Sequence, residues 1–221
     1  MERLKNKENA VLWAKKILIC LACLMVLGIG CGINVGAMQG ADPITVFYEG
    51  MSKFFHIKMG TAANIINWSF VALVFFVNRK YVNIGTVVHM FTLGMFLQWG
   101  VDIYHVFHIP NQFIWQVLAS IVGCLLCFVS LGGFIAINIG VDSWTAVTMV
   151  LSDKFGKSFK VLKVTLDILT LILGWLMGGT VGVITIFSAV VGGPLIQKSA
   201  EVLDKLFNKM LKSGCEAQIE D

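Results

Sequence analysis

Charged residues are scarce in this chain of 221 amino acids. They make up 14% of the sequence and prolines number three, whereas hydrophobic residues make up 57%. With a mean hydropathy of +0.81, this composition excludes a water-soluble domain, whose surface needs far more charge. Apolar stretches of about 20 residues recur, which is the length that spans the hydrocarbon layer of a bilayer. The sequence therefore predicts an all-α integral membrane protein, with the lipid bilayer as its partner.

The sequence also lacks the motifs of common catalytic sites. It has no nucleotide-binding glycine loop, no zinc-protease signature and no G-x-S-x-G elbow. No nucleophile, base and orienting group stand together at a recognisable spacing. We therefore expect neither an enzyme nor a cofactor, and an ATP-driven pump would need a separate subunit.

The apolar stretches predict six membrane spans. Two segments between them, 43–55 and 143–155, are too short to cross the bilayer as helices, so each is either re-entrant or interfacial. The predicted spans are 13–37, 59–78, 84–105, 111–138, 158–178 and 180–200.

Lysine and arginine indicate the orientation of the spans, because basic residues that flank spans tend to stay in the cytoplasm. With six crossings, four basic clusters fall on one side, and the opposite loop 105–112 has no lysine or arginine. Lys53 and Lys58 are the exceptions. The N- and C-termini are therefore predicted to be cytoplasmic, and the net charge of +4 requires no nucleic acid. The clusters lie at 3–16, 79–80, 154–163 and 198–212.

The two halves of the chain share residues at nearly constant spacing. The spacing is 104 (138 − 34) in the first span, 100 (142 − 42) after it, and 99 (185 − 86) near the end of each half. The change from 104 to 100 predicts about four extra residues in the first half, around 37–40. The matches include Cys20 and Cys124, Asn34 and Asn138, Asp42 and Asp142, Thr45 and Thr145, and Thr86 and Thr185.

An internal repeat of three spans and one short helix has a topological consequence. Because three is an odd number of crossings, the second copy enters the membrane from the opposite face. The predicted units are residues 1–108 and 109–200, followed by a cytoplasmic amphipathic tail at 201–221. Inverted repeats are typical of secondary transporters, whose sites lie near the midplane where the repeats meet. Channels use them as well.

The repeated motif G-x-D-x-x-T stands where each short helix begins. Asp42 and Asp142 are suited to act as N-caps, and Pro43 occupies a position that tolerates proline. If both helices begin at membrane depth, this paired interruption marks the site, because non-helical backbone there must be buried or line a cavity. Alternatively, both aspartates merely cap interfacial helices at opposite surfaces.

Further polar residues lie within the predicted spans. Asp167 is near the middle of the fifth span, where a carboxylate is costly unless it faces a partner or a polar cavity. Asn67 is its counterpart, and Asn64 lies one turn away. Asn34 and Asn138 recur at the ends of the first and fourth spans. The candidate pathway residues are Asn34, Asp42, Asn64, Asn67, Asn138, Asp142 and Asp167.

Histidine and cysteine do not indicate a metal site. His105 and His108 stand near Asp102, but zinc needs three or four convergent ligands and no fourth is evident. The C-x-x-C pairs that begin at Cys20 and Cys124 lie inside apolar helices, where small residues favour helix packing. We expect no bound metal.

The second half closes on the motif T-x-x-x-A-x-x-x-G-P-x-I, which comprises Thr185, Ala189, Gly193, Pro194 and Ile196. With the glycine-rich first helix and the G-x-D-x-x-T motif, it resembles the YczE/YyaS/YitT family of bacterial membrane proteins over residues 28–198. In the first half, Met90 and Met95 replace the alanine and proline of this motif, and Ile184 stands where the family usually has glycine. The resemblance implies a multi-pass protein of the bacterial cytoplasmic (inner) membrane and supplies no substrate.

These features predict a small-solute permease or exporter that works by alternating access between two inverted halves. Asp167 would be the coupling carboxylate if transport is coupled to protons. The alternatives are a non-transporting membrane scaffold or regulatory partner and, less favoured, a membrane enzyme. The glycine faces are compatible with a homodimer, although a monomer with six spans suffices for a pathway.

Overall fold

The computed structural model describes residues 2–108, 110 and 112–216, and this part of the chain is helical without strands. This confirms the predicted all-α membrane fold. The elements are α1 (Glu2–Ala37), α2 (Pro43–Phe55), α3 (Met59–Val77), the short 3₁₀ helix η1 (Arg79–Tyr81), α4 (Ile84–Val106), α5 (Phe113–Ile137), α6 (Ser143–Phe155), α7 (Phe159–Leu176) and α8 (Val183–Glu216).

Within the described part of the chain, five helices are long and apolar enough to cross a membrane. They are Ala10–Ala37, Met59–Val77, Ile84–Val106, Phe113–Ile137 and Val183–Met210. The remaining predicted span, 158–178, forms α7. Its 18 residues include three charged ones, Lys160, Lys163 and Asp167, and these charges set it apart from the five.

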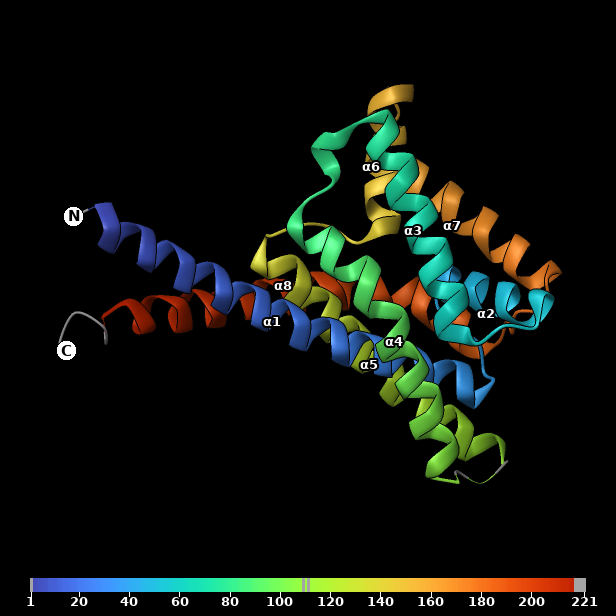
Figure 1. Ribbon diagram of the computed structural model, residues 1–221. Coiled ribbons are helices and arrows are strands. Elements are labelled where there is room, and N and C mark those ends of the chain that lie inside the picture. Colours follow the sequence, from blue (N-terminus) through green and yellow to red (C-terminus); the bar gives the residue numbers. More distant parts are fainter. Residues whose placement is uncertain (1, 109, 111, 217–221) are drawn as a thin grey trace.

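The helices form two groups that are interleaved in the sequence. Helix α1 packs against α4 and α5, and α5 packs against α8. In the second group, α2 and α6 each pack against both α3 and α7. The contact between α3 and α4 joins the two groups, which Figure 1 shows along the left and bottom and at the upper right. Consecutive helices are thus divided between the groups, so neither group is a continuous part of the chain.

Glycines allow the first group of helices to approach closely. A β-carbon at Gly32 of α1 would lie 2.6 Å from the Cα of Gly100 in α4. At Gly132 of α5, a β-carbon would lie 2.8 Å from the backbone nitrogen of Ala200 in α8. These separations are shorter than any real β-carbon contact, so only glycine permits this backbone packing.

The two short helices have the predicted bounds, and each begins inside the bundle. In α2, Thr45 is 1% exposed whereas Phe54 is 61% exposed. In α6, Ser143 is fully buried whereas Phe155 is 60% exposed. The burial falls along each helix, so neither lies flat on a surface. Figure 1 shows α2 running from the middle of the molecule to its right edge and α6 running toward the top.

The segments that lead into the short helices are equally long, at 38–42 and 138–142. The four extra residues predicted around 37–40 are therefore not in this connection. Met38 and Asn138 follow α1 and α5 with nearly the same left-handed φ, 56° and 53°. The equivalent of Asn138 is thus Met38, and Asn34 lies one turn earlier, inside α1.

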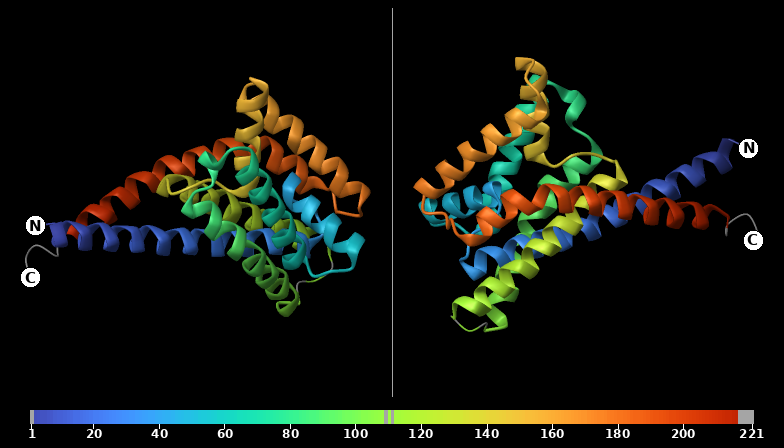
Figure 2. Two further views of the ribbon diagram at one scale, coloured as in Figure 1. Left: turned by 45° about the horizontal axis from the view of Figure 1, so that its top comes forward. Right: turned by 180° about the vertical axis from the view of Figure 1, so that it is seen from behind.

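Both ends of the described chain lie on the same side of the molecule in all views (Figures 1 and 2). Helix α8 continues without interruption through 201–216, so the predicted tail begins as an extension of α8 and not as a separate helix. Residues 217–221 of that tail lie outside the described residues.

A first prediction concerns the contact between α1 and α4. Gly32→Ala should lower the free energy of unfolding by about 1–3 kcal/mol, because its methyl group forces the two backbones apart. Gly193→Ala is the matched control, since a β-carbon there meets nothing within 4 Å. Thermal unfolding of the purified protein in detergent measures both changes. An equal loss in the two variants would contradict the close packing.

Candidate functional site at the starts of α2 and α6

The starts of α2 and α6 have the same local structure. Asp42 and Asp142 are extended residues, and the Oδ2 atom of each accepts a hydrogen bond from the backbone N–H three residues later. The N–O distances are 3.3 Å to Thr45 and 2.9 Å to Thr145. Each carboxylate satisfies a free N–H of the first turn. The predicted N-caps are confirmed, and both aspartates are partly buried.

The extended segments before these helices are bound by the opposite half of the chain. The backbone N–H of Gly85 in α4 donates to the carbonyl of Ile139 at 3.0 Å. The N–H of Ile184 in α8 donates to the carbonyl of Gln39 at 3.1 Å. Because these donors belong to the first turn of a helix, they have no partner within it. Each half thus supplies the hydrogen bond that the other half's interrupted backbone needs.

The matched threonines lie at this exchange. Thr86 Oγ1 donates to the carbonyl of Val141 at 2.7 Å. Thr185 Oγ1 accepts from the N–H of Gly182 at 3.3 Å and lies against Gly40. Gly40 has a φ of 91°, which an L side chain rarely adopts. These contacts give a structural reason for the threonine that occurs at the same place in each half.

Tyr48 and Asn67 form the polar contact of the first half. The Tyr48 hydroxyl donates to Asn67 Oδ1 at 3.0 Å, and Asn67 is fully buried. The Nδ2 group of Asn67 has no hydrogen-bond partner within the described part of the chain. Tyr48 lies within electrostatic range of both Asp42 and Asp142. The sequence analysis missed Tyr48, because its role depends on how α2 packs against α3.

Asp167 is paired. Its Oδ1 atom accepts from Trp144 Nε1 at 2.8 Å and forms an ion pair with Lys163 Nζ at 2.6 Å. Asp42 lies within electrostatic range of both Lys163 and Asp167. Asp42, Asp142 and Asp167 therefore gather around the starts of the short helices. Lys163 was missed, although its position four residues before Asp167 on one helix could have revealed it.

His89 of α4 is buried at the start of α6. Its Nδ1 atom is 3.2 Å from Ser143 Oγ, and Asp142 is within electrostatic range. The ring also packs near Phe134, with 6.1 Å between ring centroids. His89 thus adds a titratable side chain to this group. We call the group the central junction, comprising Asp42, Tyr48, Asn67, His89, Asp142, Lys163 and Asp167.

Three candidate asparagines lie outside the central junction. Asn34 Nδ2 donates to Cys124 Sγ at 3.5 Å in the contact between α1 and α5. Asn64 Oδ1 lies against Gly94 between α3 and α4. Asn138 is exposed at the end of α5. The structure therefore brings Asp42, Asn67, Asp142 and Asp167 together, but not these asparagines.

The buried cysteines contribute to helix packing. Cys31 Sγ and Cys127 Sγ are 3.4 Å apart between α1 and α5, and Cys127 also donates to the Leu27 carbonyl at 3.7 Å. The contact with Cys127 comes from Cys31, which belongs to neither C-x-x-C pair. Elsewhere, Gln98 Nε2 donates to Asp102 at 2.9 Å. In the part of the chain that the structure describes, no three metal-binding side chains lie together.

Polar contacts join the two halves at both ends of the second helix group. At one end, Thr180 donates to Glu49 through its backbone N–H at 2.9 Å and its hydroxyl at 2.7 Å, and Lys53 Nζ donates to Thr180 Oγ1 at 3.2 Å. Glu49 is only 4% exposed and also pairs with Lys53 at 2.6 Å. We call this the Thr180 latch. Sequence reasoning missed Glu49.

At the opposite end, the Tyr81 hydroxyl donates to Asp153 in the last turn of α6. We call this contact the Tyr81 latch. The hydrogen bond to the carboxylate raises the pKa of Tyr81 above its usual range. The latch is therefore intact at neutral pH and is lost only as the pH rises through that raised pKa. Positions 53 and 153 differ by 100 (153 − 53), and positions 81 and 180 by 99 (180 − 81), so the latches occupy equivalent places.

These features define a class of protein, namely a helical membrane protein whose interior contains polar side chains and two interruptions of the helical backbone. The family of unknown function DUF6198 matches residues 14–200, and the chain belongs to this family. An uncharacterized protein of Haemophilus influenzae is 25% identical over 192 residues, which are 87% of this chain and 86% of that protein. The uncharacterized membrane protein YczE of Bacillus subtilis is 22% identical over 190 residues, 85% and 86% of the two chains. No solved structure matches the chain.

A second prediction tests the cap at Asp142. Asp142→Ala should lower the free energy of unfolding by about 1 kcal/mol, because the first turn of α6 loses its acceptor. Asp142→Asn keeps an acceptor oxygen and should be close to the unsubstituted protein. Chemical unfolding in mixed micelles measures both. An equal loss for the asparagine variant would show that the charge, and not the cap, stabilises this position.

A third prediction concerns the pair formed by Lys163 and Asp167. A double-mutant cycle with Lys163→Gln and Asp167→Asn should give a coupling free energy of about 1 kcal/mol, since the partly exposed pair is screened. Lys160→Gln is the control lysine on the same helix. If Lys160 couples to Asp167 as strongly as Lys163 does, the observed ion pair is not specific.

Proposed function

We propose that this protein is a small-solute transporter of the bacterial cytoplasmic membrane that works by alternating access between two inverted halves. The halves are residues 1–108 and 109–200, and α7 is the sixth crossing. Both termini face the cytoplasm, so the basic clusters at 79–80 and 154–163 are cytoplasmic too. The protein moves a solute and catalyses no chemical reaction.

The observation that best supports this proposal is that α2 and α6 begin within the bundle, next to extended backbone. Chain of this kind persists at membrane depth only where it is buried in protein or lines an aqueous cavity. Discontinuous helices whose starts meet between repeats are the usual setting of a transporter site. The central junction therefore supports a solute site between Asp42 and Asp142.

Several correspondences support an inverted repeat. The short helices have 13 residues each and the same cap. The hydrogen bonds from Gly85 to Ile139 and from Ile184 to Gln39 are equivalent within one position, since their donors differ by 99 (184 − 85) and their acceptors by 100 (139 − 39). The latches follow the same spacing. Shared geometry at these separate places is hard to explain without a common repeat.

The charges of α7 are compatible with a crossing. Lys163 and Asp167 neutralise each other one turn apart, and Trp144 donates a further hydrogen bond to the carboxylate. Lys160 lies near the start of the helix, where a long side chain can reach the interface. The carboxylate of Asp167 can release Lys163 and bind a solute or a proton in its place. We therefore assign Asp167 the role of the coupling carboxylate.

The latches provide the two ends of an alternating-access cycle. Both are closed in this structure, which corresponds to an occluded state. Opening the Tyr81 latch while the Thr180 latch stays closed exposes the central junction to the cytoplasm, and the reverse exposes it to the outside. The glycine contacts of α1 with α4 and of α5 with α8 lie within the first and the second half, so each half stays packed while one moves against the other.

The fourth prediction uses a cysteine probe at the central junction. In a variant without native cysteines, Thr145→Cys should react with a membrane-impermeant maleimide from either side of oriented vesicles. Tyr81→Phe should increase labelling from the cytoplasmic side, and Glu49→Gln should increase labelling from the outer side, because each weakens one latch. Labelling followed by mass spectrometry measures the rates.

Phe76→Cys is the matched control, because this side chain is 83% exposed on α3 and should face lipid. Its labelling should be slow from both sides and insensitive to the latch variants. If Thr145→Cys reacts from one side only, and neither latch variant changes that, the alternating-access proposal fails. The scaffold alternative would then account better for the family.

A further inference from the structure

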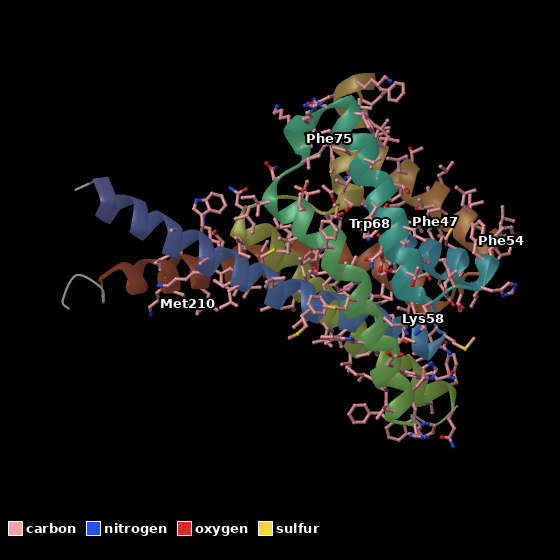
Figure 3. The ribbon with its side chains drawn as sticks, viewed as in Figure 1. Phe47, Phe54, Lys58, Trp68, Phe75 and Met210 are labelled. Carbon is pink, nitrogen blue, oxygen red and sulfur yellow. The ribbon has the colours of Figure 1, made fainter. Side chains whose placement is uncertain are left out.

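A groove of about 320 Å³ lies at the end of the molecule where α1 and α4 end and α3 begins. Its walls include the apolar side chains of Val35, Ile57 and Val101. Glu49, Lys53, Lys58 and His105 also line it. Figure 3 shows Lys58 at the start of α3. The groove therefore combines apolar walls with basic side chains near the ends of membrane-crossing helices.

The two lysines of the groove differ in their partners. Lys53 pairs with the buried Glu49 at 2.6 Å and donates to Thr180. Lys58 is exposed, and among the described residues no hydrogen bond or ion pair involves its ammonium group. Glu49 is therefore compensated within the Thr180 latch, and Lys58 gives the groove an uncompensated positive charge.

We infer that this groove binds the head group of an anionic phospholipid. The groove lies where helix ends meet the polar layer of a bilayer, so lipid head groups are the ligands present there at the highest concentration. A lipid phosphate near Lys58 would be attracted by the positive charge of its ammonium group. The glycerol and the first carbons of the acyl chains would contact Val35, Ile57 and Val101. This inference goes beyond the proposed function and does not depend on it.

Charge complementarity favours an anionic lipid over a zwitterionic one. Lys53 and Lys58 are the two lysines that depart from the basic side of the predicted topology, and both line this groove. A binding role accounts for that departure. Because Lys53 belongs to both the groove and the Thr180 latch, a bound phosphate competes with Glu49 and Thr180 for its ammonium group.

The test is lipid binding by native mass spectrometry. The delipidated full chain is titrated with phosphatidylglycerol, or with phosphatidylcholine carrying the same acyl chains. Lys58→Gln should weaken phosphatidylglycerol binding about fivefold and leave phosphatidylcholine binding unchanged. Lys157→Gln is the matched control, since this exposed lysine lies in the corresponding turn between α6 and α7.

A second variant separates groove binding from general surface attraction. Ile57→Trp fills the groove without changing its charge, so it should also weaken phosphatidylglycerol binding, with an unchanged melting temperature as the check on folding. Equal effects of Lys58→Gln and Lys157→Gln would overturn the inference. So would unchanged binding in Ile57→Trp, or complete competition by millimolar inorganic phosphate, which would identify a site for the free anion.

Discussion

The fold depends on how the hydrogen-bonding groups of two stretches of non-helical backbone are satisfied within the helix bundle. Residues 38–42 and 138–142 interrupt the helical chain inside the bundle, and an unpaired carbonyl there would cost several kcal/mol. The first turns of α4 and α8 have N–H groups that no helix can use, and they donate to Ile139 and Gln39. The carbonyls of the extended segments lack donors and the N–H groups of the helix starts lack acceptors. Each therefore satisfies the other across the boundary between the halves.

This exchange also positions the charges. With the extended segments fixed, Asp42 and Asp142 cap their helices at places set by the opposite half, and His89 and Ser143 meet beside one of them. The positive end of each short helix is partly offset by its own carboxylate. Lys163 is the cation of the group, and it is bound to Asp167. The three carboxyl groups of the central junction are thus each held by a hydrogen bond, and one of them also pairs with a lysine.

Much of this architecture could be predicted because the chain marks it locally. Glycine, aspartate and proline fix where α2 begins, and apolar length fixes the spans, so the bounds of both short helices agreed with the structure. The contacts of Tyr48, Glu49 and Trp144 could not be predicted, since each joins elements whose packing no local pattern specifies. The prediction that Asn34 and Asn138 occupy equivalent places was wrong for a related reason. Identity at a constant spacing does not show which residue ends the helix, and Met38 holds that place in the first half.

The hydrogen bond from Ile184 to Gln39 spans 145 positions (184 − 39) of the chain. A ribosome delivers the acceptor long before the donor, so the first interrupted segment enters the membrane with its carbonyl unpaired. Its partner arrives only with the last helix. The early half must therefore wait in an incomplete state, accessible to water or to an insertion factor, until synthesis is nearly finished. A chain cut short before α8 would keep that exposed carbonyl, which gives the cell a physical feature by which an unfinished copy differs from a complete one.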